Sequence, residues 1–394
     1  MTRIEDRERV LFLYLPTGGG HLSNCKAISR RVAERYGAET LAYDPVSARS
    51  PLGKLFLEGG YRFMSLRLPW MWNLLFELND NPFIMRLSQG SARRFSRYGL
   101  RYIIDEWKPT RIVCLHHLLS PAVAAALEGR EPIPVTVVAT DPFVPPKLWA
   151  HGHEYPIVCM SEEARDSFLA MGVDESRLRT YSIIIGEKFE RRMDEEARAA
   201  FKRSVGLDPE RPLVLIAGGG DGMRGADRIL DELCSSSLDY QVALVCGRDE
   251  RTRKRAEAKA LEYRIRGRRV VVFGFTDRMY ELMESADAIV SKAGPAVLGE
   301  VLAAGKPNVI AFYIPGQEKP NVRWVEEKGV GVYCPEPARM RAVVERLLTD
   351  DEYRAGMERA IARLGFKNGL YEIAEAVMST EALAPAAPAG QEAL

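Results

Sequence analysis

The feature that most constrains the fold of this chain is a series of short, almost wholly apolar runs that alternate with segments of helical periodicity. Strands this apolar are buried on both faces, which is typical of a parallel sheet covered by helices on both sides. The sequence therefore predicts an α/β fold, with strands over residues 10–15, 111–116, 134–140, 212–220, 241–247, 269–275, 287–294 and 307–313.

Glycine-rich turns follow an apolar run in each half of the chain, TGGGH at 17–21 and GGGDGMRG at 218–225. Such turns are typical of doubly wound units, and a chain of 394 residues is too long for one ordinary core. We expect two Rossmann-like doubly wound domains that face each other across a cleft. The expected boundaries are 1–184 for the N-terminal domain, 185–378 for the C-terminal domain and 379–394 for a disordered Ala/Pro-rich tail.

The composition excludes several classes of protein. The formal net charge is +1, which argues against a globally basic nucleic-acid-binding protein. The six cysteines are scattered without a C-x-x-C pair or a spacing suited to zinc, so we expect reduced thiols and a cytoplasmic location. The charged N-terminus has no signal-peptide pattern.

The two glycine loops are candidate sites for an anion or a substrate. Glycines after a strand let the backbone approach an anion, and the helix that follows offers free N–H groups. GGGH at 18–21 fits neither the dinucleotide fingerprint nor the P-loop, so it is either a structural turn or a loop that presents His21 as a base. The second loop lies where a pyrophosphate binds an open sheet, which marks Gly219 and Gly220 as donor-binding candidates and indicates a transferase.

Several longer motifs make the sequence specific. In chain order they are GGGH (18–21), GGGDGM (218–223), VCGRD (245–249), FGFTDRMYELMESAD (273–287) and SKAGPAVLGEVLAAGKPNVIAFYIPGQEKPNVRWVEEKGVGVY (291–333). With these motifs the chain resembles glycosyltransferase family 28, in particular the monogalactosyl- and glucosyl-diacylglycerol synthases, from about Val10 to about Val377. The resemblance implies a B-type glycosyltransferase fold, a UDP-sugar donor in the C-terminal domain, a lipid acceptor in the N-terminal domain, and inverting transfer without a metal or other cofactor.

Residue chemistry agrees with a donor site in the second half of the chain. Glu300 can accept hydrogen bonds from both hydroxyls of a ribose. The alternative is that it is an ordinary solvated residue on the surface of its helix. Lys292 and Arg248 either neutralise the leaving diphosphate or form surface ion pairs. The other candidates, expected near the nucleobase or the sugar hydroxyls, are Phe275, Thr276, Gly294, Gln317, Glu318 and Asn321.

An inverting transfer needs a base that takes the proton from the attacking hydroxyl, and a histidine suits that role near neutral pH. His21 is the first candidate, with Gly19 and Gly20 beside it on the acceptor side. Asp141, in TDPF, is either the base itself or the group that orients His21; the alternative is a strand-end turn.

One part of the family pattern is missing from this chain. The resembled family leads us to expect T-D-x-x-x-H-x-x-W, and here TDPFVPPKLW keeps the Thr, the Asp and Trp149, an acceptor-side candidate, but has one extra residue and Pro145 in place of the histidine. His151 and His153 are candidate substitutes for it. As a pair they are a weak metal site, because no third ligand is evident.

The segment 50–101 is the expected acceptor and membrane side of the protein. It is rich in Trp, Phe, Leu and Met, and from Lys54 to Arg101 eight basic residues outnumber three acidic ones. None of its apolar runs reaches the roughly 20 residues that span a bilayer, so it is either a face that rests on anionic lipid or an internal pair of helices. The first reading predicts membrane contacts by Trp70, Trp72, Arg93 and Arg94.

These observations predict a peripheral enzyme at the cytoplasmic face of a membrane, which moves galactose or glucose from a UDP-sugar to diacylglycerol or a related lipid. Two alternatives stay open. One is an N-acetylglucosamine transferase that acts on an undecaprenyl-linked peptidoglycan precursor. The other is a UDP-sugar or lipid sensor without turnover, suggested by Pro145.

Overall fold

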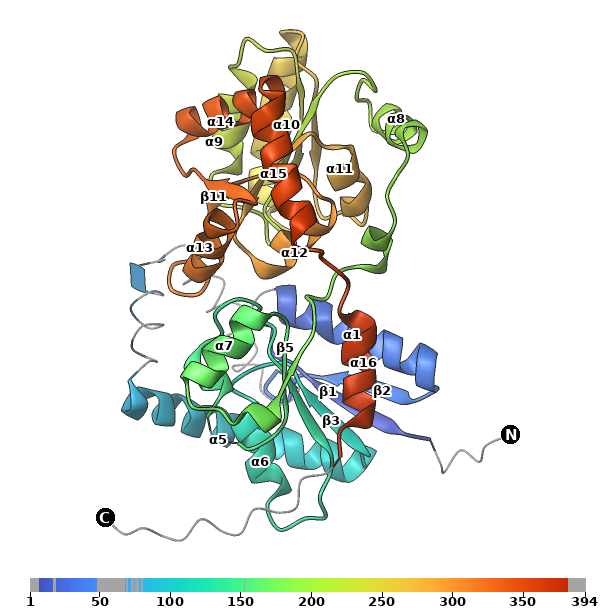
Figure 1. Cartoon of the computed structure of the whole chain (residues 1–394), viewed down its shortest axis with the longest axis vertical. Helices are drawn as coiled ribbons and strands as arrows, with labels where there is room; N and C mark the ends of the chain where they lie inside the picture. The colour runs from blue at the N-terminus through green and yellow to red at the C-terminus, as the bar shows by residue number, and fades with distance from the viewer. Residues whose placement is uncertain are drawn as a thin grey trace. The chain divides into compact units, whose positions relative to one another are not determined.

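The structure is a computed structural model that describes residues 7–16, 19–47, 68, 70, 71, 74, 78, 81–151 and 153–381. It divides into two units, the first formed by Met1–Ile183 with Gly369–Leu394 and the second by Ile184–Asn368. Each unit holds a six-stranded sheet in which all neighbouring strands are parallel. The predicted fold class, two doubly wound α/β units, is confirmed (Figure 1).

The sheet of the first unit has the strand order β2-β1-β3-β4-β5-β6. Its strands are β1 (Arg9–Leu13), β2 (Glu39–Tyr43), β3 (Arg111–Cys114), β4 (Val135–Val138), β5 (Ile157–Cys159) and β6 (Leu178–Thr180). Its described helices are α1 (Gly19–Tyr36), α5 (Pro82–Trp107), α6 (Ser120–Leu127), α7 (Glu162–Ala170) and α16 (Leu370–Ser379), with short 3₁₀ turns η3 (Lys147–Trp149) and η4 (Glu175–Arg177). Because β1 has β2 on one side and β3 on the other, the strand order reverses at the β1/β3 pair.

The sheet of the second unit has the order β12-β11-β10-β7-β8-β9. Its strands are β7 (Leu213–Ala217), β8 (Gln241–Val245), β9 (Val270–Phe273), β10 (Ala288–Lys292), β11 (Asn308–Phe312) and β12 (Gly331–Tyr333). Its helices are α8 (Glu195–Ser204), α9 (Ala226–Cys234), α10 (Glu250–Ile265), α11 (Met279–Ser285), α12 (Pro295–Ala303), α13 (Lys319–Glu327), α14 (Pro337–Thr349) and α15 (Asp351–Arg363), preceded by the turn η5 (Glu187–Glu190). Here the strand order reverses at the β7/β10 pair, and ligands of open α/β sheets bind at such reversals.

Burial explains why the central strands are so apolar. All four residues of β4 and all five of β7 are buried, with helices packed on both faces of each sheet. At roughly 25 cal/mol per Å² of buried apolar surface, these strands supply a large share of the folding free energy. A charge placed in them would be stranded without a partner.

The last helix corrects the expected domain boundaries. The predicted division after residue 184 lies one residue from the observed one, but residues 369–378, expected in the C-terminal domain, belong to the first unit. The helix α16 packs on α1 and buries five apolar side chains (Figure 1). Its end is fixed by Thr380, whose carbonyl accepts a 2.6 Å hydrogen bond from Arg111 and whose hydroxyl accepts a 2.8 Å bond from Thr136. Beyond Glu381 the expected tail lies outside the described residues.

The helix α5 carries the described part of the aromatic and basic segment. It starts at a regular cap, because the Asn81 side chain accepts a 2.9 Å hydrogen bond from the Phe83 N–H and Pro82 occupies the first turn. Among the residues that the structure describes, no helix is both long enough and apolar enough to cross a membrane.

Candidate functional site

In the first unit, three histidines gather where the strand order reverses. His21 lies in the first turn of α1, which follows β1, while His116 and His117 follow β3. The ring centroids of His21 and His116 are 4.8 Å apart, and those of His116 and His117 are 4.4 Å apart. The predicted base therefore lies at the edge of the sheet where such folds bind ligands. It contacts His116, which in turn contacts His117, and the sequence analysis selected neither of these two histidines.

His21 is held by the strand-end residue Thr140. Its Nδ1 lies 2.7 Å from the Thr140 Oγ1, and only 8% of the residue is exposed. Burial lowers the pKa of the imidazole below its ordinary value of 6.5, although the Asp141 charge and a hydrogen bond to the Leu115 carbonyl favour the protonated ring. A neutral imidazole at neutral pH is the form that can accept a proton.

The residue that holds Asp141 is Trp149, not the Thr140 that holds His21. The Asp141 Oδ2 accepts a 2.8 Å hydrogen bond from the indole N–H of Trp149. Trp149 was expected to contact acceptor or membrane, but its side chain is fully buried, so in this structure the indole serves to fix the Asp141 carboxylate.

His153 does not take the place of the histidine that the family pattern leads us to expect at Pro145. Both ring nitrogens of His153 are used, because Nε2 donates to the Trp149 carbonyl at 2.9 Å and Nδ1 accepts from the Tyr155 N–H at 3.3 Å. Burial lowers the pKa of His153 to about 4. His151, by contrast, is exposed.

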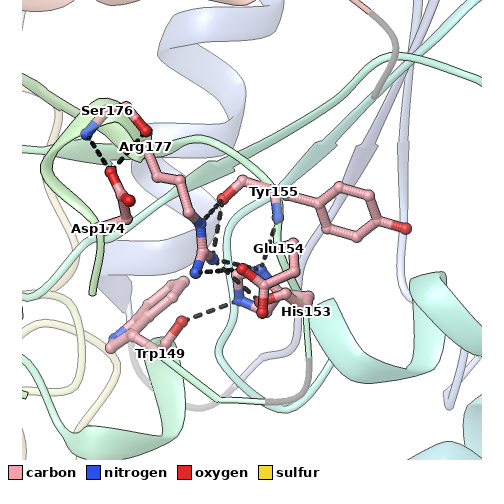
Figure 2. A network of polar contacts seen from close by, with 7 residues as sticks. All are labelled: Trp149, His153, Glu154, Tyr155, Asp174, Ser176 and Arg177. Carbon is pink, nitrogen blue, oxygen red and sulfur yellow. Dashed lines mark hydrogen bonds and ion pairs between the residues drawn. The ribbon is translucent and has the colours of Figure 1, made fainter. Parts of the chain in front are cut away.

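Arg177, in η4, holds the loop that contains His153, Glu154 and Tyr155 (Figure 2). Arg177 donates to the backbone carbonyls of His153 and Tyr155 at 3.0 and 3.1 Å and pairs with the Glu154 carboxylate at 2.9 Å. The Arg177 side chain is largely buried, whereas the Glu154 carboxylate is exposed, so the ion pair is open to solvent on the Glu154 side. The chain of contacts from Arg177 through His153 and Trp149 leads to Asp141.

His117, a third histidine of this cluster, follows β3 at a position that the sequence alone could have indicated. Its ring packs edge-on against Trp149, with 5.5 Å between ring centroids, and its Nδ1 is buried without a hydrogen-bond partner in the described part of the chain. Burial lowers the pKa of His117 to about 3. Two histidines directly after an apolar strand, as in RIVCLHH, are the signal that marks this position.

In the second unit, the glycine loop after β7 lies beside the start of α12. Gly219 has a φ of 78°, a conformation that favours glycine, and a Cβ there would lie 3.2 Å from Val297. Gly220 accepts a 2.9 Å hydrogen bond from the Arg248 N–H, which ties the loop after β7 to the loop after β8. These loops and Gly294, the residue before α12, meet at the β7/β10 reversal.

Arg248 and Phe275 lie together at this edge. The guanidinium carbon of Arg248 is 5.0 Å from the centre of the Phe275 ring, and its Nη1 is 3.2 Å from Asp221. Phe275 is 66% exposed, so it is not a core residue. Thr276 accepts a 3.1 Å hydrogen bond from the Arg278 N–H and shapes the turn after β9.

Glu300 is a candidate donor residue whose carboxylate has no partner among the described residues of this unit. It is partly buried in α12, and its carboxylate makes no hydrogen bond or ion pair with any described residue. Burial raises the pKa of Glu300 from its ordinary value of 4.5 to about 7. A carboxylate in this state gains hydrogen bonds when a diol binds to it.

The other predicted sugar ligands are largely turned inward. Glu318 accepts hydrogen bonds from the Lys292 ammonium at 3.1 Å and from the Ile314 N–H at 2.8 Å. The Asn321 amide donates to the Ala293 carbonyl at 2.8 Å, and both side chains are buried. They brace the turn between β10 and α12, while Gln317 lies partly buried just before α13.

The membrane-side candidates are only partly described. Trp70 is 67% exposed and Arg93 and Arg94 are also exposed, whereas Trp72 lies outside the described residues. Gly19 and Gly20 form the first turn of α1 beside His21. Among the described side chains, no group of three or more His, Cys, Asp or Glu is placed to hold a metal ion.

The chain is similar in sequence to curated proteins over most of its length. Monogalactosyldiacylglycerol synthase of Spinacia oleracea is 27% identical over 355 residues, which cover 87% of this chain and 66% of the relative. The chain spans about two thirds of the length of the curated relatives that it matches first.

Solved structures show the same fold at low identity. MurG of Acinetobacter baumannii matches with a TM-score of 0.62 and 13% identity, over 95% of this chain and all of that one. HepE of Anabaena, solved with UDP and glucose, matches with a TM-score of 0.57 and 13% identity over the same shares. The fold is therefore the glycosyltransferase B type.

Two family models match the chain, each over most of one unit. Residues 21–185 match the model described as monogalactosyldiacylglycerol (MGDG) synthase, and residues 213–376 match the glycosyltransferase family 28 C-terminal domain. These matches include the glycine loop, Glu300 and the loop PGQEKPN in the second unit, and His21 and Asp141 in the first. The chain therefore belongs to the MGDG synthase family through its N-terminal unit and to the family 28 glycosyltransferases through its C-terminal unit.

Proposed function

We propose that this protein transfers a hexose, galactose or glucose, from a UDP-sugar to diacylglycerol or a related membrane lipid, with inversion at the anomeric carbon. One observation carries the proposal: each unit places its unsatisfied or reactive groups at the reversal of its own strand order. In the first unit this group is a neutral histidine, and in the second it is an unpaired carboxylate beside a glycine loop.

The donor is assigned to the second unit. The Glu300 carboxylate would accept from the ribose hydroxyls, and the glycine loop with the N-terminus of α12 would receive the diphosphate. Phe275 offers an exposed ring for the nucleobase. The relative HepE, which was solved with UDP and glucose, supports a nucleotide sugar at this kind of fold.

The reaction is a single displacement. The lipid hydroxyl attacks the anomeric carbon, the bond between that carbon and the diphosphate oxygen breaks, and the hydroxyl proton passes to His21. The negative charge that develops on the departing UDP is stabilised by the helix N-terminus and by Lys292 and Arg248. No step of this scheme uses a metal ion.

The test is an assay with three donors and two acceptors. The protein is incubated with UDP-glucose, UDP-galactose or UDP-N-acetylglucosamine and with vesicles that contain diacylglycerol or an undecaprenyl-linked precursor. Each reaction is run with and without a chelator, and the lipid products are identified by mass spectrometry. We expect hexosyl-diacylglycerol, unaffected by the chelator. Transfer of N-acetylglucosamine to the undecaprenyl lipid would favour the first alternative, and donor binding without any product would favour a sensor.

We further propose that α5 and the segment before it dock on an anionic lipid surface. Phe83, Leu87 and Tyr98 lie on one face of α5 at helical spacing, and all three are exposed. The exposed Arg93, Arg94, Arg97 and Arg86 lie on the same helix. Exposed aromatic rings with basic neighbours are typical of interfacial helices.

Replacing Arg93, Arg94 and Arg97 together by glutamine should weaken binding to anionic vesicles by about 3 kcal/mol at low salt, since each basic residue near such a surface contributes about 1 kcal/mol. Added salt should mimic the loss by screening. Replacing Trp70 and Phe83 by serine should weaken binding independently of salt. Co-sedimentation with anionic and neutral vesicles measures both effects, and a thermal melt checks folding. Normal vesicle binding by both variants would show that this face of α5 does not contact the membrane.

A further inference from the structure

His21 has two neighbours that act on it in different ways, and they are consecutive in the chain. Thr140 contacts the His21 Nδ1 directly, at 2.7 Å, through a buried neutral hydroxyl. Asp141 acts on the ring through its charge, while its own carboxylate is held by Trp149. In many histidine-dependent enzymes one carboxylate both orients the imidazole and stabilises its charged form.

We propose that Thr140 and Asp141 divide this task, with Thr140 as the positioning residue that orients His21 and fixes its tautomer, and Asp141 as the source of stabilising charge. The inference rests on the proposed function, in which His21 takes the proton of the acceptor hydroxyl. It assigns to Thr140 a role in the reaction that its place at a strand end does not by itself suggest.

The chemistry of a hydroxyl suits this role. In the proposed state before transfer, the His21 Nδ1–H donates to the Thr140 oxygen, which leaves the lone pair of the ring on Nε2 to receive the proton. The Leu115 carbonyl is a second acceptor for the ring and favours its protonated form. After transfer, both ring nitrogens carry a hydrogen, and the Nδ1–H still donates to the same oxygen. The contact therefore survives the reaction without rearrangement.

The surroundings of His21 explain why the division is useful. The titratable groups that act on its ring or stack near it are Asp141, His116 and His117, and burial lowers the pKa of both neighbouring histidines. A carboxylate bonded directly to Nδ1 would favour the protonated ring before the substrate arrives. A neutral hydroxyl orients the ring without doing so, and Asp141 supplies its attraction from a greater distance.

The chain offers a matched control in β4, the strand that precedes Thr140. Thr136 in β4 is also a buried threonine, and its hydroxyl bonds to Thr380 in α16. Thr136→Val removes a buried hydroxyl of the same kind, four residues before Thr140, and leaves the Thr140–His21 contact in place. Thr140→Val keeps the shape of the side chain, and Thr140→Ser keeps its hydroxyl.

The first experiment measures the rate of a single turnover with diacylglycerol vesicles. Thr140→Val should lower this rate on the order of 10- to 100-fold, a part of the general-base contribution, with unchanged affinity for UDP-glucose. Thr140→Ser should stay within about threefold of the wild type, and Thr136→Val should react normally. Asp141→Asn should move the acidic limb of the pH profile to lower pH, and Thr140→Val should move it much less. A Thr140→Val protein with the wild-type rate, or a loss equally large in Thr136→Val, overturns the proposal.

The second experiment does not depend on turnover. Nitrogen-15 NMR of the imidazole, assigned with a His21→Gln variant, reports which ring nitrogen carries the hydrogen. We expect Nδ1–H in the wild type and a mixture of tautomers in Thr140→Val, whereas a wild-type ring protonated mainly on Nε2 refutes the inference. If the protein transfers no sugar at all but this tautomer shift occurs, the proposed function fails and the role of Thr140 in orienting His21 stands.

Discussion

Replacing His21 by alanine is expected to lower kcat by roughly 10² to 10⁴ while the affinity for UDP-glucose stays unchanged, because the loss of a general base acts on the chemical step alone. The proposed donor residues lie in the second unit, whereas His21 lies in the first. Transfer to diacylglycerol vesicles gives kcat, calorimetry gives the donor affinity, and His21→Gln serves as a second variant that leaves less of a cavity. Since His21 is buried, a thermal melt must show that each variant folds.

The partner variant Asp141→Asn separates two roles that the sequence left open. If Asp141 acts through His21, the double variant should be no slower than His21→Ala, because residues that act as a unit lose activity only once. If Asp141 is itself the base, its variant should be the slower one. A His21→Ala protein with normal turnover would mean that GGGH is only a turn.

The pH profile gives an independent check with a definite sign. A protonated His21 cannot accept a proton, so activity should fall as the pH drops through the pKa of the ring. Burial lowers that pKa below 6.5, so the acidic limb should lie below 6.5 in the wild type. An acidic limb well above 6.5 would contradict the assignment of His21 as the base.

The central strands could be predicted from the sequence because burial on both faces makes them continuously apolar. The eight expected runs correspond to β1, β3, β4 and β7 to β11, with ends that differ by a few residues. The strands β2, β5, β6 and β12 were missed. Of these, β2 and β12 are edge strands with partly exposed residues, and β5 and β6 have only three residues each. The strand β5 is apolar throughout but too short to stand out, and the other three lack the continuous apolar pattern that marked the predicted strands.

The sequence indicated which residues are candidates for the site, but not which residues they contact. Motifs located His21, Asp141 and Glu300 because glycine turns and strand ends mark the ligand edge of a parallel sheet. Sequence spacing could not reveal that Thr140, not Asp141, contacts His21, because a shift of one residue at a strand end decides which side chain points where. The inward direction of Glu318 and Asn321 depends on the fold of the β10–α12 turn in the same way.

The return of α16 to the first unit shows a different limit. The sequence places residues 370–379 directly after the second unit, so chain order alone assigns them there. Their position is decided by a contact that is distant in sequence, between the apolar face of α16 and α1. No local pattern carries that information.

Replacing Glu300 by glutamine is expected to change stability and donor binding in opposite directions. The pKa of Glu300 is about 7 in the folded protein against an ordinary value of 4.5, so the folded state binds more protons than the unfolded state between these values. The free energy of unfolding is therefore not reduced by Glu300 below pH 4.5, and the ionisation of Glu300 lowers it as the pH rises from 4.5 to about 7. Because Glu300→Gln cannot ionise, it should be more stable than the wild type at pH 8, by about 1 to 3 kcal/mol, and close to it at pH 5. Denaturant unfolding at both pH values measures this difference, and Glu352→Gln, at an exposed carboxylate of α15, is the matched control.

The same variant should bind UDP-glucose more weakly, by about 1.5 to 3 kcal/mol, because hydrogen bonds to a charged acceptor are lost. The ionised carboxylate accepts from the ribose hydroxyls more strongly than the protonated acid does. The wild-type affinity should therefore also fall as the pH drops below about 7, and this dependence should vanish in Glu300→Gln. UDP-glucose is the proper probe, since its diphosphate does not titrate in this range as free UDP does. A structural glutamate predicts the reverse pattern, a less stable variant with unchanged donor affinity. A site residue that costs stability until its ligand arrives is the signature expected of a carboxylate kept unpaired for a ribose.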